Sequence, residues 1–174
     1  MKEFDSQCSE CGGTIKFEQC SHRYAECGIS NLVLKRVLVA ECPQCGNTEF
    51  ILPGLGPLHR AIARALVTSP GLLTGEQLRF LRKHAGLNAA DFSSYLHITP
   101  TILQKWESGE ENMSVETDGL IRLLIAILDS DIEASAHDVV EHLPRVGLDA
   151  GADYEIQLDG ETLIPTFCRV LRAA

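Results

Sequence analysis

The chain has 174 residues, 45% of them hydrophobic, and a net charge of −9. This length allows one ordinary domain or two to three small ones, and the apolar content excludes general disorder. No apolar run approaches the ~18 residues of a membrane span, and MKEFDSQCSE lacks the basic and apolar segments of a signal peptide. We therefore expect a cytoplasmic protein with no membrane partner.

The negative charge is concentrated in the last third of the chain. Residues 114–174 hold 4 Lys or Arg against 12 Asp or Glu, whereas 61–113 hold 5 of each kind. A neutral middle segment with a local basic face is compatible with DNA binding, because repulsion would exclude only a uniformly acidic unit.

In chain order, a β-rich segment comes first. The stretches TIKFE, LVLKRVLVAE and TEFIL carry β-branched residues with partial alternation. The break PGLGP then opens a helical stretch, LHRAIARALV, and a second break, SPGLLTG, leads into several short helices. We predict an α+β chain whose β-rich and helical parts have separate cores. Its parts are a β-rich domain over 1–56, a linker helix over 57–73, an all-α domain over 74–130 and a mixed C-terminal extension over 131–174.

Two cysteine pairs, CSECGG at 8–13 and CPQCG at 42–46, are the strongest chemical signal. Two sulfurs three positions apart on a tight turn can share one metal ion, and the glycine that follows permits the turn. We predict a structural zinc site of four thiolates, with no open position for catalysis: Cys8, Cys11, Cys42 and Cys45. The alternative is a pair of redox motifs, but neither pair is followed by a typical helix start.

The other cysteines and histidines form no second cluster that the sequence can complete. Cys20, His22 and Cys27 lack a fourth ligand nearby, so they are either ordinary small side chains or part of a metal site that the sequence leaves open. There is no His-x-Glu pair, phosphate-binding glycine loop or serine-nucleophile elbow. We therefore expect no enzymatic activity.

The middle segment has the pattern of three short helices. Asn88 and Thr99 are good N-caps, and Pro100 suits the first position of the third helix. Leu103 and Trp106 are three residues apart, so both should face inward, with Trp106 as a large core residue. Polar side chains should face outward on the same helix: Thr101, Gln104, Lys105 and Ser108.

A helix, a tight turn and a second helix with a polar face form the helix-turn-helix arrangement that enters the major groove of DNA. On the first of the three short helices, three basic residues are candidates for phosphate contacts: Arg79, Arg82 and Lys83. The alternative is the ordinary solvated surface of a helical bundle.

The C-terminal extension contains a candidate helix, EASAHDVVEHL, followed by YEIQL and ETLIPTFCRV around an Asp-Gly turn. The extension either completes a homodimer interface or forms a charged cap. We favour the dimer, because operators of this fold usually have two half-sites.

The residues LRFLRKHAGL, DFSSYLHI, WESG and LIRLL resemble the Xre/Cro-type helix-turn-helix family. Together with the CxxCG and CPxCG motifs, residues 8–128 are similar to the MqsA-type antitoxin family, in which a YgiT-type zinc finger precedes that domain. The resemblance implies a repressor that binds a palindromic operator in its own promoter as a homodimer. It also implies that the zinc domain neutralises a small ribonuclease toxin.

By position, the resemblance implies that Thr101 and Lys105 read bases, with Thr99, Pro100 and Gln104 beside them. Families of this kind often have arginine at the position of Lys105. A lysine offers a single ammonium charge and lacks the two parallel N–H donors with which arginine binds guanine. Two other functions remain open: a stand-alone regulator without a toxin, and a zinc adaptor whose helical domain only mediates association.

Overall fold

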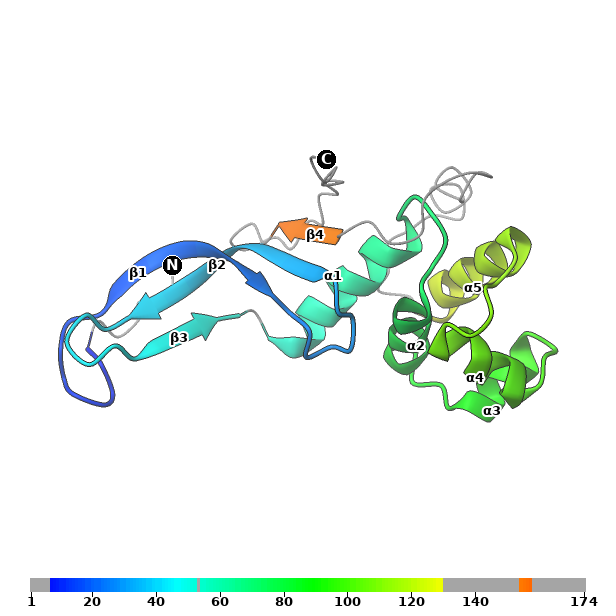
Figure 1. Ribbon diagram of the computed structural model, residues 1–174, viewed down its shortest axis with the longest axis horizontal. Coiled ribbons are helices and arrows are strands. Elements are labelled where there is room, and N and C mark those ends of the chain that lie inside the picture. The colour runs from blue at the N-terminus through cyan, green and yellow to red at the C-terminus, as the bar shows by residue number, and fades with distance from the viewer. Residues whose placement is uncertain (1–6, 53, 130–153, 158–174) are drawn as a thin grey trace.

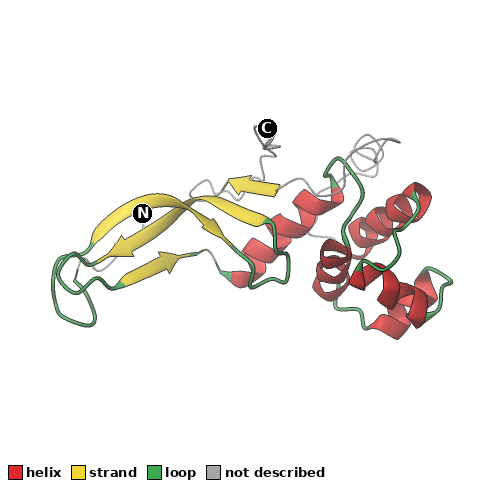
Figure 2. Ribbon diagram, in the orientation of Figure 1, coloured by secondary structure: helices red, strands yellow, loops and turns green. Residues whose placement is uncertain are grey.

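The structure is a computed structural model that describes residues 7–52, 54–129 and 154–157. Its strands are β1 (Lys16–Arg23), β2 (Leu32–Glu41), β3 (Thr48–Ile51) and β4 (Tyr154–Gln157). Its helices are α1 (Leu55–Val67), α2 (Gly75–His84), α3 (Ala89–Tyr95), α4 (Pro100–Ser108) and α5 (Val115–Leu128). The predicted α+β class is confirmed: the strands gather at one end and α2 to α5 at the other, with α1 between them (Figures 1 and 2). None of the described helices is long and apolar enough to cross a bilayer.

Strand β2 is the centre of the sheet. It pairs with β1 in antiparallel fashion along nearly its whole length, from Glu41 opposite Lys16 to Val33 opposite Arg23. Its other edge is shared, since β3 pairs antiparallel with 38–41 and β4 pairs parallel with 32–35. YEIQL was expected to start a hairpin, and in the structure its first four residues, 154–157, form the strand β4 beside β2. The second arm of that hairpin and the expected helix at 133–143 lie outside the described residues.

A bulge divides the sheet into two halves. Cys20 lies opposite Val37 and His22 opposite Leu34, so one residue of β1 faces two of β2. Arg36, one of these two, has φ of +59°. A bulge increases the local twist of a strand pair. It therefore turns the cysteine-bearing half of the sheet away from the half that packs on α1.

The hydrophobic core is continuous from the sheet to the last helix, which corrects the expectation of separate cores. One cluster of buried side chains joins Leu32 and Leu34 of β2 to Ile62 of α1, and continues to Leu78 of α2 and Ile121 of α5. The reason lies in α1, which buries small and branched residues around much of its circumference. The segment predicted as a linker helix is thus packed on both sides.

Candidate metal centre and nucleic-acid interface

The two Cys-x-x-Cys segments fold into nearly identical turns. In each turn the glycine after the second cysteine donates its N–H to the carbonyl of the first cysteine, from Gly12 to Cys8 and from Gly46 to Cys42, both at 2.8 Å. The two glycines have φ of +70° and +75°, a left-handed conformation that other residues rarely adopt. The backbone turns therefore aim both cysteines of each pair toward the same side.

The structure brings the four predicted cysteines together. All four sulfur atoms lie within 4.8 Å of one another. The Cys8 and Cys45 sulfurs are 3.6 Å apart, and those of Cys11 and Cys42 are 3.5 Å apart. A tetrahedral ion with metal–sulfur bonds of about 2.3 Å requires edges of about 3.8 Å. The thiols are free of disulfides, so the cluster is positioned to hold a metal ion with four protein ligands.

Hydrogen bonds set unequal proton affinities in this cluster. The backbone N–H of Cys45 donates to the Cys42 sulfur and lowers the pKa of that thiol to about 7. The Gly13 amide acts in the same direction on Cys11, but the neighbouring cysteine side chains outweigh it and raise the pKa of Cys11 to about 12. Four thiolates in contact repel one another, and a bound cation compensates that repulsion, so metal binding is coupled to proton release.

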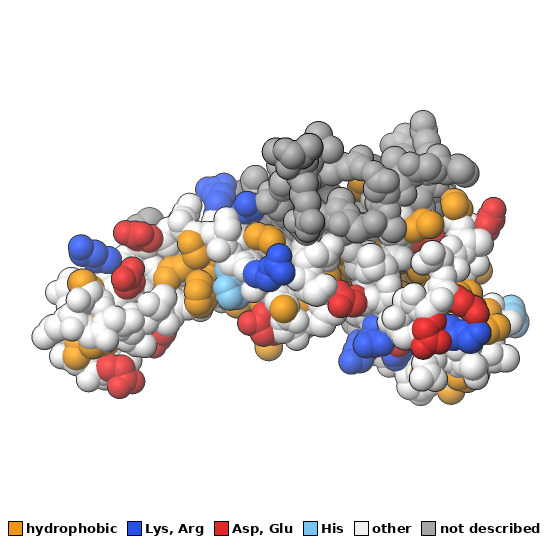
Figure 3. Space-filling model, in the orientation of Figure 1, with side chains coloured by type: hydrophobic (Ala, Val, Ile, Leu, Met, Phe, Trp, Pro, Cys, Tyr) orange, Lys and Arg blue, Asp and Glu red, His pale blue; other side chains and the backbone are white. Residues whose placement is uncertain are grey.

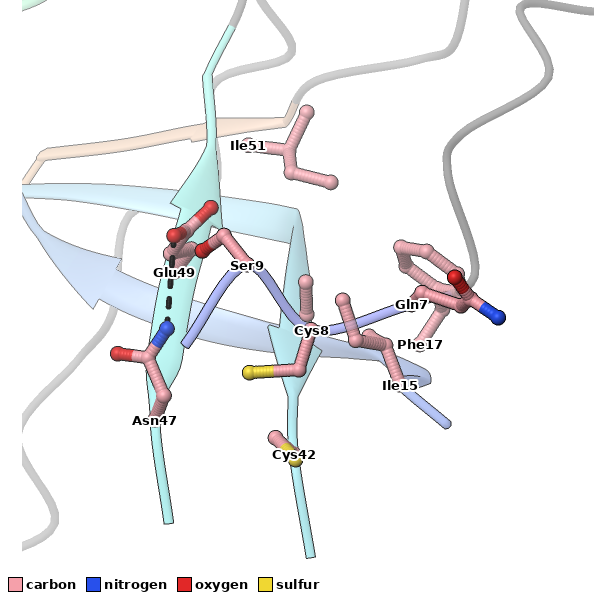
Figure 4. A pocket seen from close by; sticks show the side chains of 10 residues that line it. Gln7, Cys8, Ser9, Ile15, Phe17, Cys42, Asn47, Glu49 and Ile51 are labelled. Carbon is pink, nitrogen blue, oxygen red and sulfur yellow. Dashed lines mark hydrogen bonds between the residues drawn. The ribbon is translucent and has the colours of Figure 1, made fainter. Parts of the chain in front are cut away.

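An open hollow of about 340 Å³ lies beside the cysteine cluster on one face of the sheet. In Figure 4, Ile15, Phe17 and Ile51 line it on the apolar side, and Cys8 and Cys42 lie at its base. Phe17 is 38% exposed even though it is large and apolar. The hollow thus offers an apolar contact surface directly next to the metal centre.

The open question of a second metal site is answered for the described residues. Among them, the four cysteines are the one group of three or more metal-binding side chains close enough to share an ion. The Cys27 thiol instead donates to the Tyr24 carbonyl at 3.5 Å. The ring of His22 packs against Phe50, with centroids 4.3 Å apart.

At the other end of the molecule, α3 and α4 begin at the predicted caps. The Asn88 side chain accepts the Asp91 N–H at 2.9 Å, and the Thr99 hydroxyl accepts the Ile102 N–H at 3.3 Å. Pro100 occupies the start of α4 as predicted. The turn between the helices passes through His97, which has φ of +53°. These features place α4 directly after α3 with a tight change of direction.

The inner side of α4 differs from the prediction. Leu103 is the fully buried residue, with 1% of its surface exposed, whereas Trp106 is partly buried and packs at the border of the core. A Cβ on Gly75 would lie only 2.4 Å from the Trp106 carbonyl oxygen and 2.7 Å from that of Glu107. Gly75 therefore allows the backbones of α2 and α4 to come into close contact at the end of α4.

Glu107 fastens α4 to α2 by binding two arginines. Arg82 donates to its carboxylate at 2.6 and 3.0 Å, and Arg79 donates to the same carboxylate at 3.3 Å. Arg82 also donates to the Leu87 carbonyl and is 9% exposed. A buried guanidinium with these partners serves the fold, so Arg82 is not among the residues that we assign to DNA. The sequence pattern alone did not reveal Glu107 as its partner.

The outer side of α4 is polar, as expected. Thr99, Thr101, Gln104 and Ser108 are exposed. Lys105 is half-buried, and its ammonium lies 2.5 Å from the carboxylate of Glu111, a partner that the sequence analysis missed. On α2, Arg79 and Lys83 are exposed. Figure 3 shows Lys and Arg side chains at this end with carboxylates directly beside them.

No protein-family model, curated protein or solved structure matches this chain. The function proposed for the chain therefore rests on the geometry of its two ends.

Proposed function

We propose that the chain is a sequence-specific DNA-binding protein that uses α3, the turn at 96–99 and α4 as a helix-turn-helix. One observation carries the proposal: α4 is fixed on its inner side by Leu103 and by the Glu107 ion pairs, while its outer side exposes the hydroxyl of Thr101 and the amide of Gln104. A helix that reads base edges needs this combination of rigid support and exposed polar side chains. Thr101 and Gln104 are the proposed base-reading residues, with Thr99 and Lys105 beside them.

Phosphate contacts are assigned to Arg79 and Lys83 of α2. Arg79 keeps 47% of its side chain exposed despite its contact with Glu107, and Lys83 is also exposed. Such contacts position a protein on the duplex without reading its sequence. The small number of available cations predicts a shallow dependence of DNA affinity on salt.

We assign the cysteine cluster to a structural zinc ion. Zinc favours tetrahedral four-thiolate sites, and a closed site of this kind leaves no position for substrate. The hollow beside it, where Ile15, Phe17 and Ile51 lie next to the polar Asn47 and Glu49, supports a role in binding a protein partner. We therefore propose an antitoxin. The cysteine-bearing half of the sheet (the metal end) would bind a small ribonuclease-type toxin, and helices α2 to α5 (the helical end) would bind DNA and repress the operon. The alternative is a stand-alone regulator that has the same parts and no toxin.

A homodimer fits both versions of this proposal. Helix α5 presents Leu120 with 53% of its surface exposed and Ile127 with 77% exposed, and both lie on one helix that a second copy of the chain could cover. A second copy of the chain bound to this face would give two α4 helices for the two halves of a palindromic operator.

DNA binding is tested with a labelled fragment of the region upstream of the gene, in competition with mixed-sequence duplex. Gln104→Ala should weaken binding to the fragment by about 1–3 kcal/mol and leave the weaker mixed-sequence binding unchanged. Gln19→Ala, an exposed position on β1, makes the same change far from α4 and is the matched control. Equal retention of both duplexes by the parent protein would refute sequence-specific binding.

The toxin is tested separately by co-expression with the flanking genes. A small protein that copurifies, and whose ribonuclease activity is blocked in the complex, supports the antitoxin. Specific DNA binding without such a protein supports the stand-alone regulator.

A further inference from the structure

The loop after α4 holds Lys105 in a defined place. Gly109 ends the helix in the left-handed conformation, and the N–H groups of Glu110 and Glu111 both donate to the Lys105 carbonyl, at 2.9 and 3.3 Å. This backbone closure brings the Glu111 carboxylate to 2.5 Å from the Lys105 ammonium. The ion pair is thus set by the turn of the main chain as well as by the two side chains.

The pair is accessible to solvent. The Lys105 side chain is 42% exposed and that of Glu111 50% exposed. An exposed ion pair of this kind contributes little to folding stability, typically about 0–1 kcal/mol, because water screens it. Its position on the outer side of the proposed recognition helix therefore points to a role other than stabilising the fold.

Most of the candidate DNA-binding cations have acidic partners. Arg79 and Arg82 share Glu107, and Lys105 has Glu111. Of the four basic residues predicted to face DNA, Lys83 alone has no acidic partner among the described residues. Residues 74–129 contain five Lys or Arg and eight Asp or Glu. The helical end therefore has little net attraction for a phosphate backbone.

Sequence-independent DNA binding depends on cations that neutralise phosphates and release counterions. A lysine that already holds a carboxylate exchanges one anion for another when it meets a phosphate. The displaced carboxylate is then left unpaired beside the negatively charged duplex. A base-specific complex can offset this cost with hydrogen bonds to base edges, whereas a complex with arbitrary sequence cannot. The Glu111 hydrogen bond also raises the pKa of Lys105, as expected for an ammonium beside a carboxylate.

We propose that Glu111 is a specificity-determining residue. In complexes with non-operator DNA, where Lys105 meets a phosphate in place of a base edge, Glu111 competes with that phosphate for the ammonium and suppresses binding. This inference rests on the proposed DNA-binding function and adds a residue that by itself lowers the affinity for DNA. It assigns the loop after α4 a function in excluding wrong sequences, which is distinct from reading the right one.

The test compares the parent protein with Glu111→Gln on a fluorescein-labelled mixed-sequence duplex and on the gene's own upstream fragment, from about 50 to 200 mM salt. Glu111→Gln should bind the mixed-sequence duplex about 3- to 10-fold more tightly at low salt, with a log–log salt slope steeper by about 0.9 per protomer. The gain on the upstream fragment should be smaller, so that discrimination between the two duplexes falls.

Two further variants separate the direct contact from a general change of charge. Glu116→Gln makes the same charge change on an exposed residue of the same unit, and it should leave the salt slope unchanged. In a Lys105→Gln background, Glu111→Gln should lose most of its effect, because the cation that it releases is absent. Thermal unfolding of each variant checks that the fold is retained.

The outcomes distinguish this inference from the function on which it rests. The competition is refuted, and DNA binding stands, if the parent binds DNA but Glu111→Gln has the same affinity and salt slope. The same conclusion follows if Glu116→Gln gains as much affinity for the mixed-sequence duplex as Glu111→Gln does. If neither protein retains either duplex at any salt concentration, the DNA-binding proposal fails and the role of Glu111 fails with it.

Discussion

Arg122 and Asp118 form an ion pair of 2.6 Å in which both side chains are completely buried. The guanidinium also donates to the carbonyls of Leu66 at 2.7 Å and Gly71 at 2.6 Å, while Asp118 accepts the Leu73 N–H at 2.7 Å. The pair thus satisfies the backbone at the end of α1 and in the following loop, and attaches both to α5.

Removing one member of this pair should be severe. Arg122→Met would leave the Asp118 carboxylate buried without its cation, and we expect unfolding free energy to fall by about 3–5 kcal/mol. Urea denaturation monitored by circular dichroism measures the loss. The double variant Arg122→Met, Asp118→Leu is the control and should recover part of it, because no uncompensated charge remains. A single-variant loss below about 1 kcal/mol would contradict this account.

Gly75 and Gly56 should respond differently to alanine. Gly75→Ala places a methyl group against the Trp106 and Glu107 carbonyls, so α2 and α4 must separate, at an expected cost of about 1–3 kcal/mol. Gly56 lies in α1, and a Cβ there meets nothing within 4 Å outside its chain neighbours. The helix propensity gained by Gly56→Ala is offset by Pro57, which disfavours a helical conformation for a preceding alanine, so this variant should be close to neutral. Melting temperatures of the two variants test the difference, and a neutral Gly75→Ala would disprove the close backbone contact.

The positive φ of His97 predicts an order of stability for substitutions in the turn before α4. Glycine adopts this conformation without strain, so His97→Gly should be neutral or slightly stabilising. A β-branched residue fits it poorly, so His97→Val should cost about 1–2 kcal/mol. Chemical denaturation measures both variants. His97 is exposed, so lost packing would not account for the difference, and equal stabilities would argue against the left-handed turn.

Metal removal should unfold only the far half of the sheet. Val37 belongs to the continuous core, but Val39 and the four cysteines do not. We therefore expect the cysteine-bearing half of the sheet to depend on a bound metal ion for its order, whereas 24–37 remain held by α1. With a chelator, hydrogen exchange should become fast in 8–19 and 39–51 and stay slow in α1 and α2. Loss of protection throughout the chain would show that the metal stabilises the entire core.

His59 predicts a loss of stability in mild acid. Burial lowers the pKa of this imidazole, with a contribution from the nearby His84, so the folded state holds it neutral beside the Tyr24 hydroxyl at 3.1 Å. The unfolded chain takes up a proton near pH 6.5, which the folded chain resists. The contribution of His59 to the unfolding free energy is therefore complete above about pH 6.5. It decreases as the pH falls through this value and levels off below the lowered pKa.

Unfolding free energies at pH 5, 6 and 7 measure this effect. The unfolding free energy of His59→Gln should fall less between pH 7 and 5 than that of the parent. Tyr24→Phe keeps the histidine, so its unfolding free energy should retain most of the parent's dependence on pH. Identical profiles for the parent and His59→Gln would remove His59 as the cause.

Local sequence determined the features that depend on near neighbours. The Cys-x-x-Cys-Gly spacing predicted two metal-binding turns, because a glycine with positive φ is required at a fixed offset from the cysteines. Asn88, Thr99 and Pro100 located the starts of α3 and α4, because capping involves amides only two or three residues away.

Tertiary structure decided everything that depends on contacts across long separations. Arg82 and Lys83 are adjacent and equally basic in the sequence, yet one is buried against Glu107 and the other is exposed, because the approach of α2 to α4 covers one side of α2. The same approach sets the Trp106 and Glu107 carbonyls against Gly75, a contact across a long sequence separation that the helical spacing did not reveal. The joining of the sheet to the helices through α1 likewise had no local signal, since helical periodicity shows which residues are apolar but not how many neighbours will cover them.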